Sequence, residues 1–299
     1  MTYRNFAAQA VPFLEKFARS AMSHAPSSAA FAYWLASTIR EAQHFSLPEG
    51  GKLLDDKLRG LVGEEIRLPY PKITVECVSN DPSSVRPDQI FAPRRLAIAV
   101  EGGFALERLR QIMRVEGDIA IFGVSECEGM WVPDVTGVTV QHVQEPLPDG
   151  GMISVDVFVA MPEAFELTVK RYGGRREALD AVAEDLSFEV RSVCELLEAL
   201  SCSNVSTQRV AQASPTVNRK RESKGKTPLL DYHVLVIDRP TPLNGTSRGP
   251  LIGERASPRQ HLRRGHIRRY ATGKKVWINS MLVGQQEHGV IVKDYEARV

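Results

Sequence analysis

Seven cations lie within residues 257–284, and no acidic residue separates them. They are Arg259, Arg263, Arg264, Arg268, Arg269, Lys274 and Lys275. Guanidinium groups bind phosphate oxygens two at a time and also stack on bases. Tyr270 and Trp277 lie in the same stretch and are the kind of side chain on which bases of single-stranded RNA stack. This combination of residue types predicts contact with a polyanion.

The same stretch alternates in the manner of strands, and residues 271–274 supply a turn between its two halves, so we expect a basic β-hairpin. Neither face of its first strand is wholly apolar, which leaves charge on both faces. Gly265 stands between arginines inside that strand and predicts a bulge or a close backbone approach. The residues expected to contact the polyanion are His261, Arg263, Arg264, Gly265, His266, Arg268, Arg269, Tyr270, Lys274, Lys275 and Trp277.

Other interpretations of this stretch stay open. His261 and His266, with Lys275, would be the groups of a metal-independent ribonuclease, because histidine can exchange protons with a phosphodiester. A DNA-binding regulator is another possibility, although no helix-turn-helix pattern is evident. The arginines could instead pair with acidic residues elsewhere while Trp277 fills the core. The sequence favours binding over catalysis, and we expect no catalytic residue, no metal site and no cofactor.

Charge is distributed unevenly along the chain. Residues 1–204 carry 20 Lys and Arg against 29 Asp and Glu, whereas residues 205–299 carry 18 against 7. We therefore predict an acidic body over 1–204 and a basic, β-rich region over 205–299 that faces a polyanion. Residues 214–228 are polar and basic without apolar periodicity, and we expect a mobile, solubilising linker there.

Apolar periodicity predicts helices over residues 3–23, 26–39 and 51–62, and again over 162–171 and 177–200. Between the two sets, strand patterns begin at about residues 73, 96, 118, 129, 137 and 152. Two more strands are expected over 205–210 and 230–237. This order of helices, then strands, then helices predicts an α+β fold around an antiparallel or mixed sheet of about five strands.

The cysteines Cys77, Cys127, Cys194 and Cys202 are scattered and form no CxxC pair, which is typical of reduced thiols in a cytosolic protein. No run approaches the roughly 18 apolar residues of a membrane span. The N-terminal residues also lack the apolar core of a signal peptide. We therefore expect a cytoplasmic protein in a bacterial host, with no membrane partner.

The C-terminal motifs resemble those of a family encoded by phages and mobile elements. The resemblance rests on PRQHLRRGHIRR at residues 258–269, GKKVWI at 273–278 and LVG at 282–284, with KGKTPLLDYHVL at 224–235 as the strand leading into them. It covers His261, Arg263, Arg264, Gly265 and His266 residue by residue. The next position is Ile267, where family members often carry Trp.

One branch of that family is an anti-CRISPR protein that suppresses production of the type V-A effector nuclease. The resemblance implies a binding protein that engages the nascent N-terminus of its target and provokes loss of the message, without blocking the finished enzyme. On this basis the expected partners are a host protein or nascent chain, together with RNA or the ribosome. The acidic body would recognise the polypeptide and the basic hairpin would contact the RNA.

Overall fold

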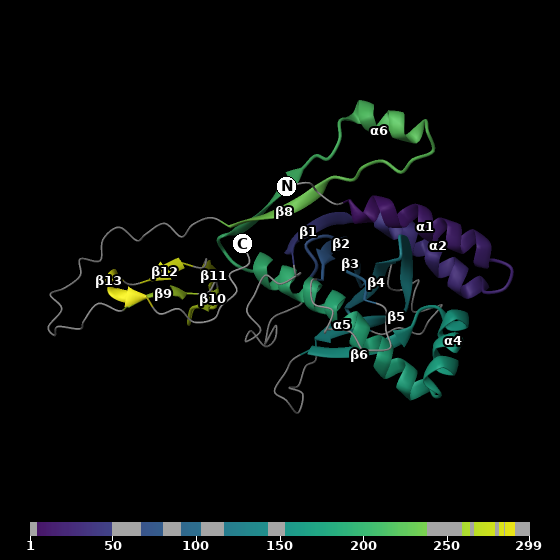
Figure 1. Cartoon of the computed structure of the whole chain (residues 1–299), viewed down its shortest axis with the longest axis horizontal. Helices are drawn as coiled ribbons and strands as arrows, with labels where there is room; N and C mark the ends of the chain where they lie inside the picture. Colours follow the sequence, from purple (N-terminus) through teal and green to yellow (C-terminus); the bar gives the residue numbers. More distant parts are fainter. Residues whose placement is uncertain are drawn as a thin grey trace. The chain divides into compact units, whose positions relative to one another are not determined.

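The computed structural model describes residues 5–49, 67–79, 91–102, 117–142, 153–237, 259–263, 266–278, 281–283 and 285–290 (Figure 1). Contacts within the chain divide it into two compact units. The larger, here the sheet unit, comprises residues 1–53, 59–198 and 207–235. The smaller, here the hairpin unit, comprises residues 54–58, 199–206 and 236–299.

Eight strands form one mixed sheet in the order β6-β5-β4-β3-β2-β1-β8-β7. They are β1 (Gln43–Glu49), β2 (Lys72–Val78), β3 (Arg94–Glu101), β4 (Ile119–Cys127), β5 (Met130–His142), β6 (Ile153–Val159), β7 (Val205–Val210) and β8 (Tyr232–Ile237). Strands β2 to β6 pair antiparallel in chain order. Strand β1 is parallel to both of its neighbours, β2 and β8.

The described residues contain five helices, and together with the sheet they confirm the predicted α+β class. The helices are α1 (Phe6–Ala21), α2 (Pro26–Glu41), α4 (Pro162–Tyr172), α5 (Arg175–Leu200) and α6 (Pro215–Glu222). The first four lie where apolar periodicity predicts them, and α1 continues through Pro12 as one helix. The helix expected over 51–62 lies outside the described residues.

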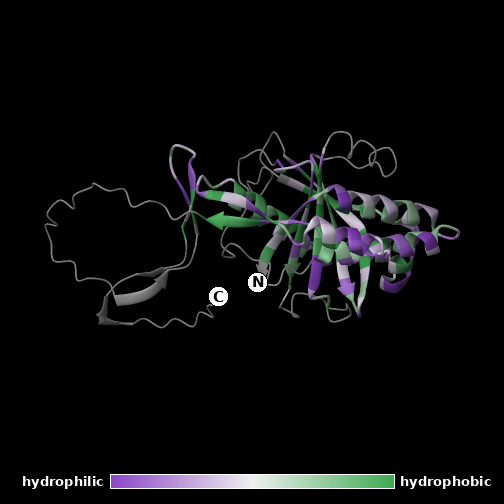
Figure 2. Ribbon diagram, turned by 90° about the horizontal axis from the view of Figure 1, so that it is seen from above, coloured by the Kyte–Doolittle hydropathy of each residue, from purple (hydrophilic) through white to green (hydrophobic). Residues whose placement is uncertain are grey.

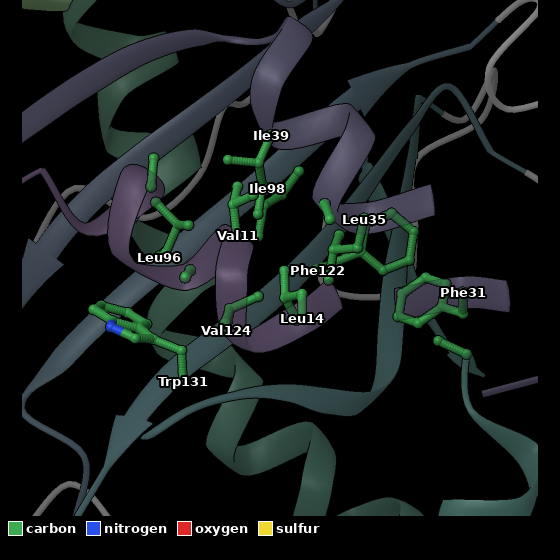
Figure 3. Packing of buried hydrophobic residues seen from close by; sticks show 14 of the residues in the cluster. Val11, Leu14, Phe31, Leu35, Ile39, Leu96, Ile98, Phe122, Val124 and Trp131 are labelled. Atoms are coloured by element: carbon green, nitrogen blue, oxygen red, sulfur yellow. The ribbon is translucent and has the colours of Figure 1, made fainter. Parts of the chain in front are cut away.

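Helices α1 and α2 pack against one face of the sheet and make the main core (Figure 3). Leu96 and Ile98 of β3, with Phe122 of β4, point into it, because every second residue of a strand faces the same side. Leu14 and Leu35 meet them from the helices and are fully buried. Burying such a side chain contributes about 1.5–3 kcal/mol. In Figure 2 the helices carry both green and purple residues, as amphipathic helices do.

Glu163 of α4 caps the N-terminus of α2. Its carboxylate accepts hydrogen bonds from the backbone amides of Ser27 at 2.9 Å and Ser28 at 3.0 Å, and from the Ser28 hydroxyl at 2.6 Å. The first amides of a helix have no partner inside it, so a carboxylate there stabilises the helix. Burial acts to raise the pKa of Glu163, but these hydrogen bonds lower it to about 2. The contact ties α4 to α2.

Two local features distinguish this sheet from the five strands expected. Strand β1 was not predicted, because Pro48 interrupts its pattern; the pairing of β1 with β2 shifts register there, between Ser46 and Glu49, where a bulge tolerates proline. The stretches over 129–133 and 137–143 are parts of one strand, β5, whose register against β4 shifts between them.

Strands β7 and β8 also belong to this sheet, where β8 pairs with β1, although the sequence assigned both to the basic C-terminal region. Within residues 214–228, expected to be a linker without regular structure, the structure has helix α6. The division at residue 204 and the mobility of 214–228 stay predictions.

Candidate polyanion-binding hairpin

In the described part of residues 259–283, here the hairpin ladder, there are two pairs of antiparallel strands. Strand β10 (His266–Arg269) pairs with β11 (Lys275–Ile278), and β9 (Arg259–Arg263) pairs with β12 (Met281–Val283). Strand β13 (Gln285–Val290) pairs irregularly with β9 in parallel.

The turn between β10 and β11 has three residues, 271–273, between the paired residues Tyr270 and Lys274. The Tyr270 amide donates to the Lys274 carbonyl at 2.9 Å, and the Gly273 amide donates to the Tyr270 carbonyl at 2.9 Å. Gly273 has φ +81°, the left-handed conformation that the last residue of such a turn requires. The Ala-Thr-Gly-Lys motif therefore forms the turn that the sequence predicts.

Residues 203 and 204, just beyond α5, cover the outer edge of β11. The Ser203 amide donates to the Lys275 carbonyl at 2.9 Å. The Asn204 side chain accepts from the Trp277 amide at 2.7 Å and donates to the Trp277 carbonyl at 2.9 Å. In an antiparallel pair the backbone groups of alternate residues point away from the partner strand, and these are the groups that residues 203 and 204 bind. β11 is thus held on both sides.

The predicted site residues separate into an exposed and a buried set. Arg268, Arg269, Tyr270 and Lys274 are exposed, and we call these four residues the hairpin tip. Tyr270 is 44% exposed, so its ring is available for stacking.

Lys275 and Trp277 are buried, with 4% and 6% of their surface exposed. The Lys275 ammonium donates to Ser201 Oγ at 3.3 Å. Trp277 pairs across the ladder with Ile267, which is also buried. In this structure Trp277 therefore packs inside the hairpin unit, as the structural interpretation of the arginine-rich stretch supposed, and does not present a stacking surface.

The remaining predicted residues are placed only by their backbone. His261 pairs with Val283 and Arg263 with Met281, both in the β9–β12 ladder, whereas His266 pairs with Ile278. Arg264 and Gly265 lie outside the described residues, and so does the bulge predicted at Gly265.

The sheet unit holds a buried polar cluster on the α1 side of the sheet. Glu76 accepts hydrogen bonds from the Ala7 amide at 2.7 Å and from the Tyr232 hydroxyl. His44 Nδ1 lies 2.7 Å from Thr74 Oγ1. Burial lowers the pKa of His44 to about 4, helped by the nearby His233, and burial raises the pKa of Tyr232 above its usual value. Both groups are neutral at pH 7, and the cluster links α1, β1, β2 and β8.

A second cluster lies between α5 and the opposite face of the sheet. Arg95 Nη2 donates to Asp185 at 2.7 Å and its Nη1 donates to Glu189 at 3.0 Å. Asp134 completes the cluster in the space left by Gly123, where a Cβ atom would come within 1.9 Å of its Oδ2. Burial raises the pKa of Glu189 to about 7 and holds the pKa of Asp134 well above its usual range. One cation thus faces three carboxyl groups, and burial disfavours the charged form of Asp134.

Neither cluster is arranged as a metal site: across the described residues, no three His, Cys, Asp or Glu side chains come together to hold an ion. The four cysteines are free thiols. None of the described helices is both long and apolar enough to cross a membrane.

Sequence reasoning missed Ser201, Ser203 and Asn204 as partners of the hairpin. Asn204 looks like a helix stop in the sequence, and nothing near it indicates a partner 73 residues away.

Comparison with known proteins places the chain in a family. A model of the anti-CRISPR type V subtype A2 (AcrVA2-like) family matches residues 52–288. The match spans the sheet from β2 onward, helix α5, helix α6 and the hairpin ladder. No curated protein and no solved structure matches the chain. Because the family model covers most of the sequence, the chain belongs to the anti-CRISPR type V subtype A2 family.

Proposed function

We propose that this protein, encoded by a phage or mobile element, lowers expression of a type V-A effector nuclease in the cytoplasm of its bacterial host. The observation that carries the proposal is the family match over residues 52–288, together with the motif resemblance in the hairpin ladder. The family match supports an anti-CRISPR role, and the motif resemblance supports a binding protein that acts during synthesis of the target.

In this proposal the acidic part of the chain recognises a host polypeptide, as a nascent chain, while the hairpin tip contacts RNA of the message or the ribosome. The tip supports the second contact by its chemistry. Two guanidinium groups, Arg268 and Arg269, and the Lys274 ammonium are exposed, on residues beside the same turn as the exposed Tyr270. Cations that hold the phosphates and a ring that stacks on a base are the two features of single-strand binding sites. His261, Arg263, Arg264, Gly265 and His266 would extend the contact along the ladder.

Binding is favoured over cleavage. A ribonuclease built on this stretch would use the Lys275 ammonium beside the two histidines, but that ammonium is buried and donates to Ser201. An ammonium enclosed in this way is poorly placed to stabilise charge on a phosphodiester in solvent.

The test is to produce the protein together with a type V-A effector nuclease in a bacterial host and to crosslink RNA and nascent chains. The tip variant is Arg268→Ala/Arg269→Ala. The matched control removes two exposed cations elsewhere, Lys170→Ala/Arg176→Ala. We expect the wild type and the control to lower effector message and protein and to recover the message, and the tip variant to lose both effects.

Equal RNA recovery from wild type and tip variant would overturn the role of the tip. An unchanged effector level with the wild type would overturn the proposed function. The captured nascent chains test the polypeptide contact separately.

A further inference from the structure

A second basic feature lies between β7 and β8, in the sheet unit, where Figure 1 shows helix α6. We call residues 214–229 the basic arm. Its helix begins at Pro215, whose fixed φ suits the first helical position, and Ser214 accepts a hydrogen bond from the Val217 amide at 3.4 Å. These are ordinary start signals, although they lie in a stretch whose composition looks like a linker.

Side-chain hydrogen bonds close the arm into a defined loop. The Asn218 side chain donates to the Leu229 carbonyl at 2.9 Å and accepts from the Leu229 amide at 2.9 Å. Arg221 Nε donates to the Thr227 carbonyl at 3.0 Å. The return is made at Gly225, whose φ is +66°. The helix and the chain that leaves it are therefore joined at two points.

No residue of α6 is buried. Most helices in proteins are stabilised by packing an apolar face, and this one packs none. What the basic arm presents to solvent is charge: Arg219 and Lys220 of α6 and Lys224 and Lys226 of the segment after it are exposed, and none of these four makes an ion pair with a described residue. Glu222 is the one acid in the arm.

We propose that the basic arm is a second RNA-binding surface, one that contacts the phosphate backbone without reading bases. Residues 214–229 contain no aromatic side chain, so the arm has nothing on which a base could stack. Phosphate contact needs only positioned cations, and the joined helix and return segment position four of them.

A protein partner fits this surface less well, because protein interfaces are anchored by buried aromatic and aliphatic residues. The one exposed large apolar side chain of α6 is Val217. The same lack of an apolar face argues against insertion into a lipid surface.

The inference rests on the part of the proposed function that gives the protein an RNA ligand, but it uses residues separate from the hairpin tip. The two surfaces would have different roles in RNA binding. The tip supplies stacking through Tyr270, whereas the arm adds affinity that is independent of sequence and sensitive to salt.

The experiment measures binding of a labelled single-stranded RNA of mixed sequence to the full-length protein, by fluorescence anisotropy over a range of salt concentrations. The arm variant is Arg219→Ala/Lys220→Ala/Lys224→Ala/Lys226→Ala. The control removes the same charge from exposed helical positions elsewhere, as Lys16→Ala/Arg19→Ala/Lys170→Ala/Arg176→Ala. The tip variant Arg268→Ala/Arg269→Ala is measured in parallel.

For four lost phosphate contacts we expect the slope of log affinity against log salt to become shallower by about 3, and the affinity to fall about tenfold or more at moderate salt. The control should retain the slope of the wild type. An arm variant with wild-type slope and affinity would overturn the inference, and so would an equal loss in the control, which would show a general effect of net charge. Binding to vesicles of anionic lipid but not to RNA would also overturn it.

The tip variant separates the two proposals. Loss of RNA affinity in the arm variant alone would support the RNA-binding role of the arm and contradict that of the tip. Loss in the tip variant alone would do the reverse.

Discussion

The side chain of Asn204 pairs with the backbone of Trp277 as a neighbouring strand would. Its Oδ1 accepts from the Trp277 amide at 2.7 Å and its Nδ2 donates to the Trp277 carbonyl at 2.9 Å. The two residues are 73 positions apart. This pairing, together with the bond from Ser203 to the Lys275 carbonyl, supplies partners on the outer edge of β11 and holds the base of the hairpin whose tip carries the exposed cations.

Replacing Asn204 with Ala should loosen β11 without changing any charge. The substitution leaves two backbone groups of a buried residue without their partner, at a cost of about 1–2 kcal/mol. Amide hydrogen exchange at Trp277 should therefore accelerate about tenfold or more. The exposed Ser206→Ala serves as control. Unchanged exchange in Asn204→Ala would show that the pair does not hold the strand.

Substitutions of two aromatic residues of the hairpin should have opposite effects on stability and RNA binding. Trp277 is buried, so Trp277→Phe should lower stability while the folded protein keeps its RNA affinity. Tyr270 is exposed, so Tyr270→Ala should leave stability unchanged and weaken RNA binding by about 1 kcal/mol or more, the contribution of one stacked base. Thermal unfolding and fluorescence anisotropy measure the two effects. If RNA affinity fell in Trp277→Phe and not in Tyr270→Ala, the assignment of the tip would be wrong.

Glu189 should make the protein less stable as the pH rises. Burial raises its pKa from 4.5 to about 7, against the attraction of Arg95. Between these values the folded protein keeps a proton that the unfolded chain has lost, so this contribution to stability is full below about pH 4.5 and is lost as the pH rises through about 7. Glu189→Gln keeps an acceptor for Arg95 and should flatten this fall. Urea unfolding at several pH values measures it, and an identical pH profile in the variant would contradict the assignment.

Glu163 should have the opposite dependence on pH. Its pKa in the folded protein is about 2, below the ordinary 4.5, so its stabilisation is present above about pH 4.5 and is lost as the pH falls through about 2. Glu163→Ala should lower the free energy of unfolding by about 1 kcal/mol at neutral pH, the usual effect of losing a helix cap. The difference from wild type should shrink in acid. A difference that stayed constant with pH would mean that the capping charge contributes nothing.

Much of the fold follows from local patterns in the sequence. The helices α1, α2, α4 and α5 were predicted because apolar residues recur every three or four positions. Strand β2 was predicted because its residues alternate, and β3 because it is a short apolar run. The turn between β10 and β11 was predicted because Gly273 adopts a backbone conformation that few other residues tolerate. These signals lie within a few residues of the structure they produce.

Other features depend on residues far apart, and no local pattern contains them. Strand β1 exists because β2 and β8 flank it, which the interruption at Pro48 conceals. Helix α6 is held by Asn218 and Leu229 in a segment whose composition suggests a linker. The same limit applies to the candidate site. The sequence by itself identified a cluster of cations and aromatic residues, because composition is visible in one dimension. Only the tertiary structure decided that Tyr270 is exposed while Lys275 and Trp277 are buried, because burial depends on which distant segment, here residues 201–204, packs against the strand.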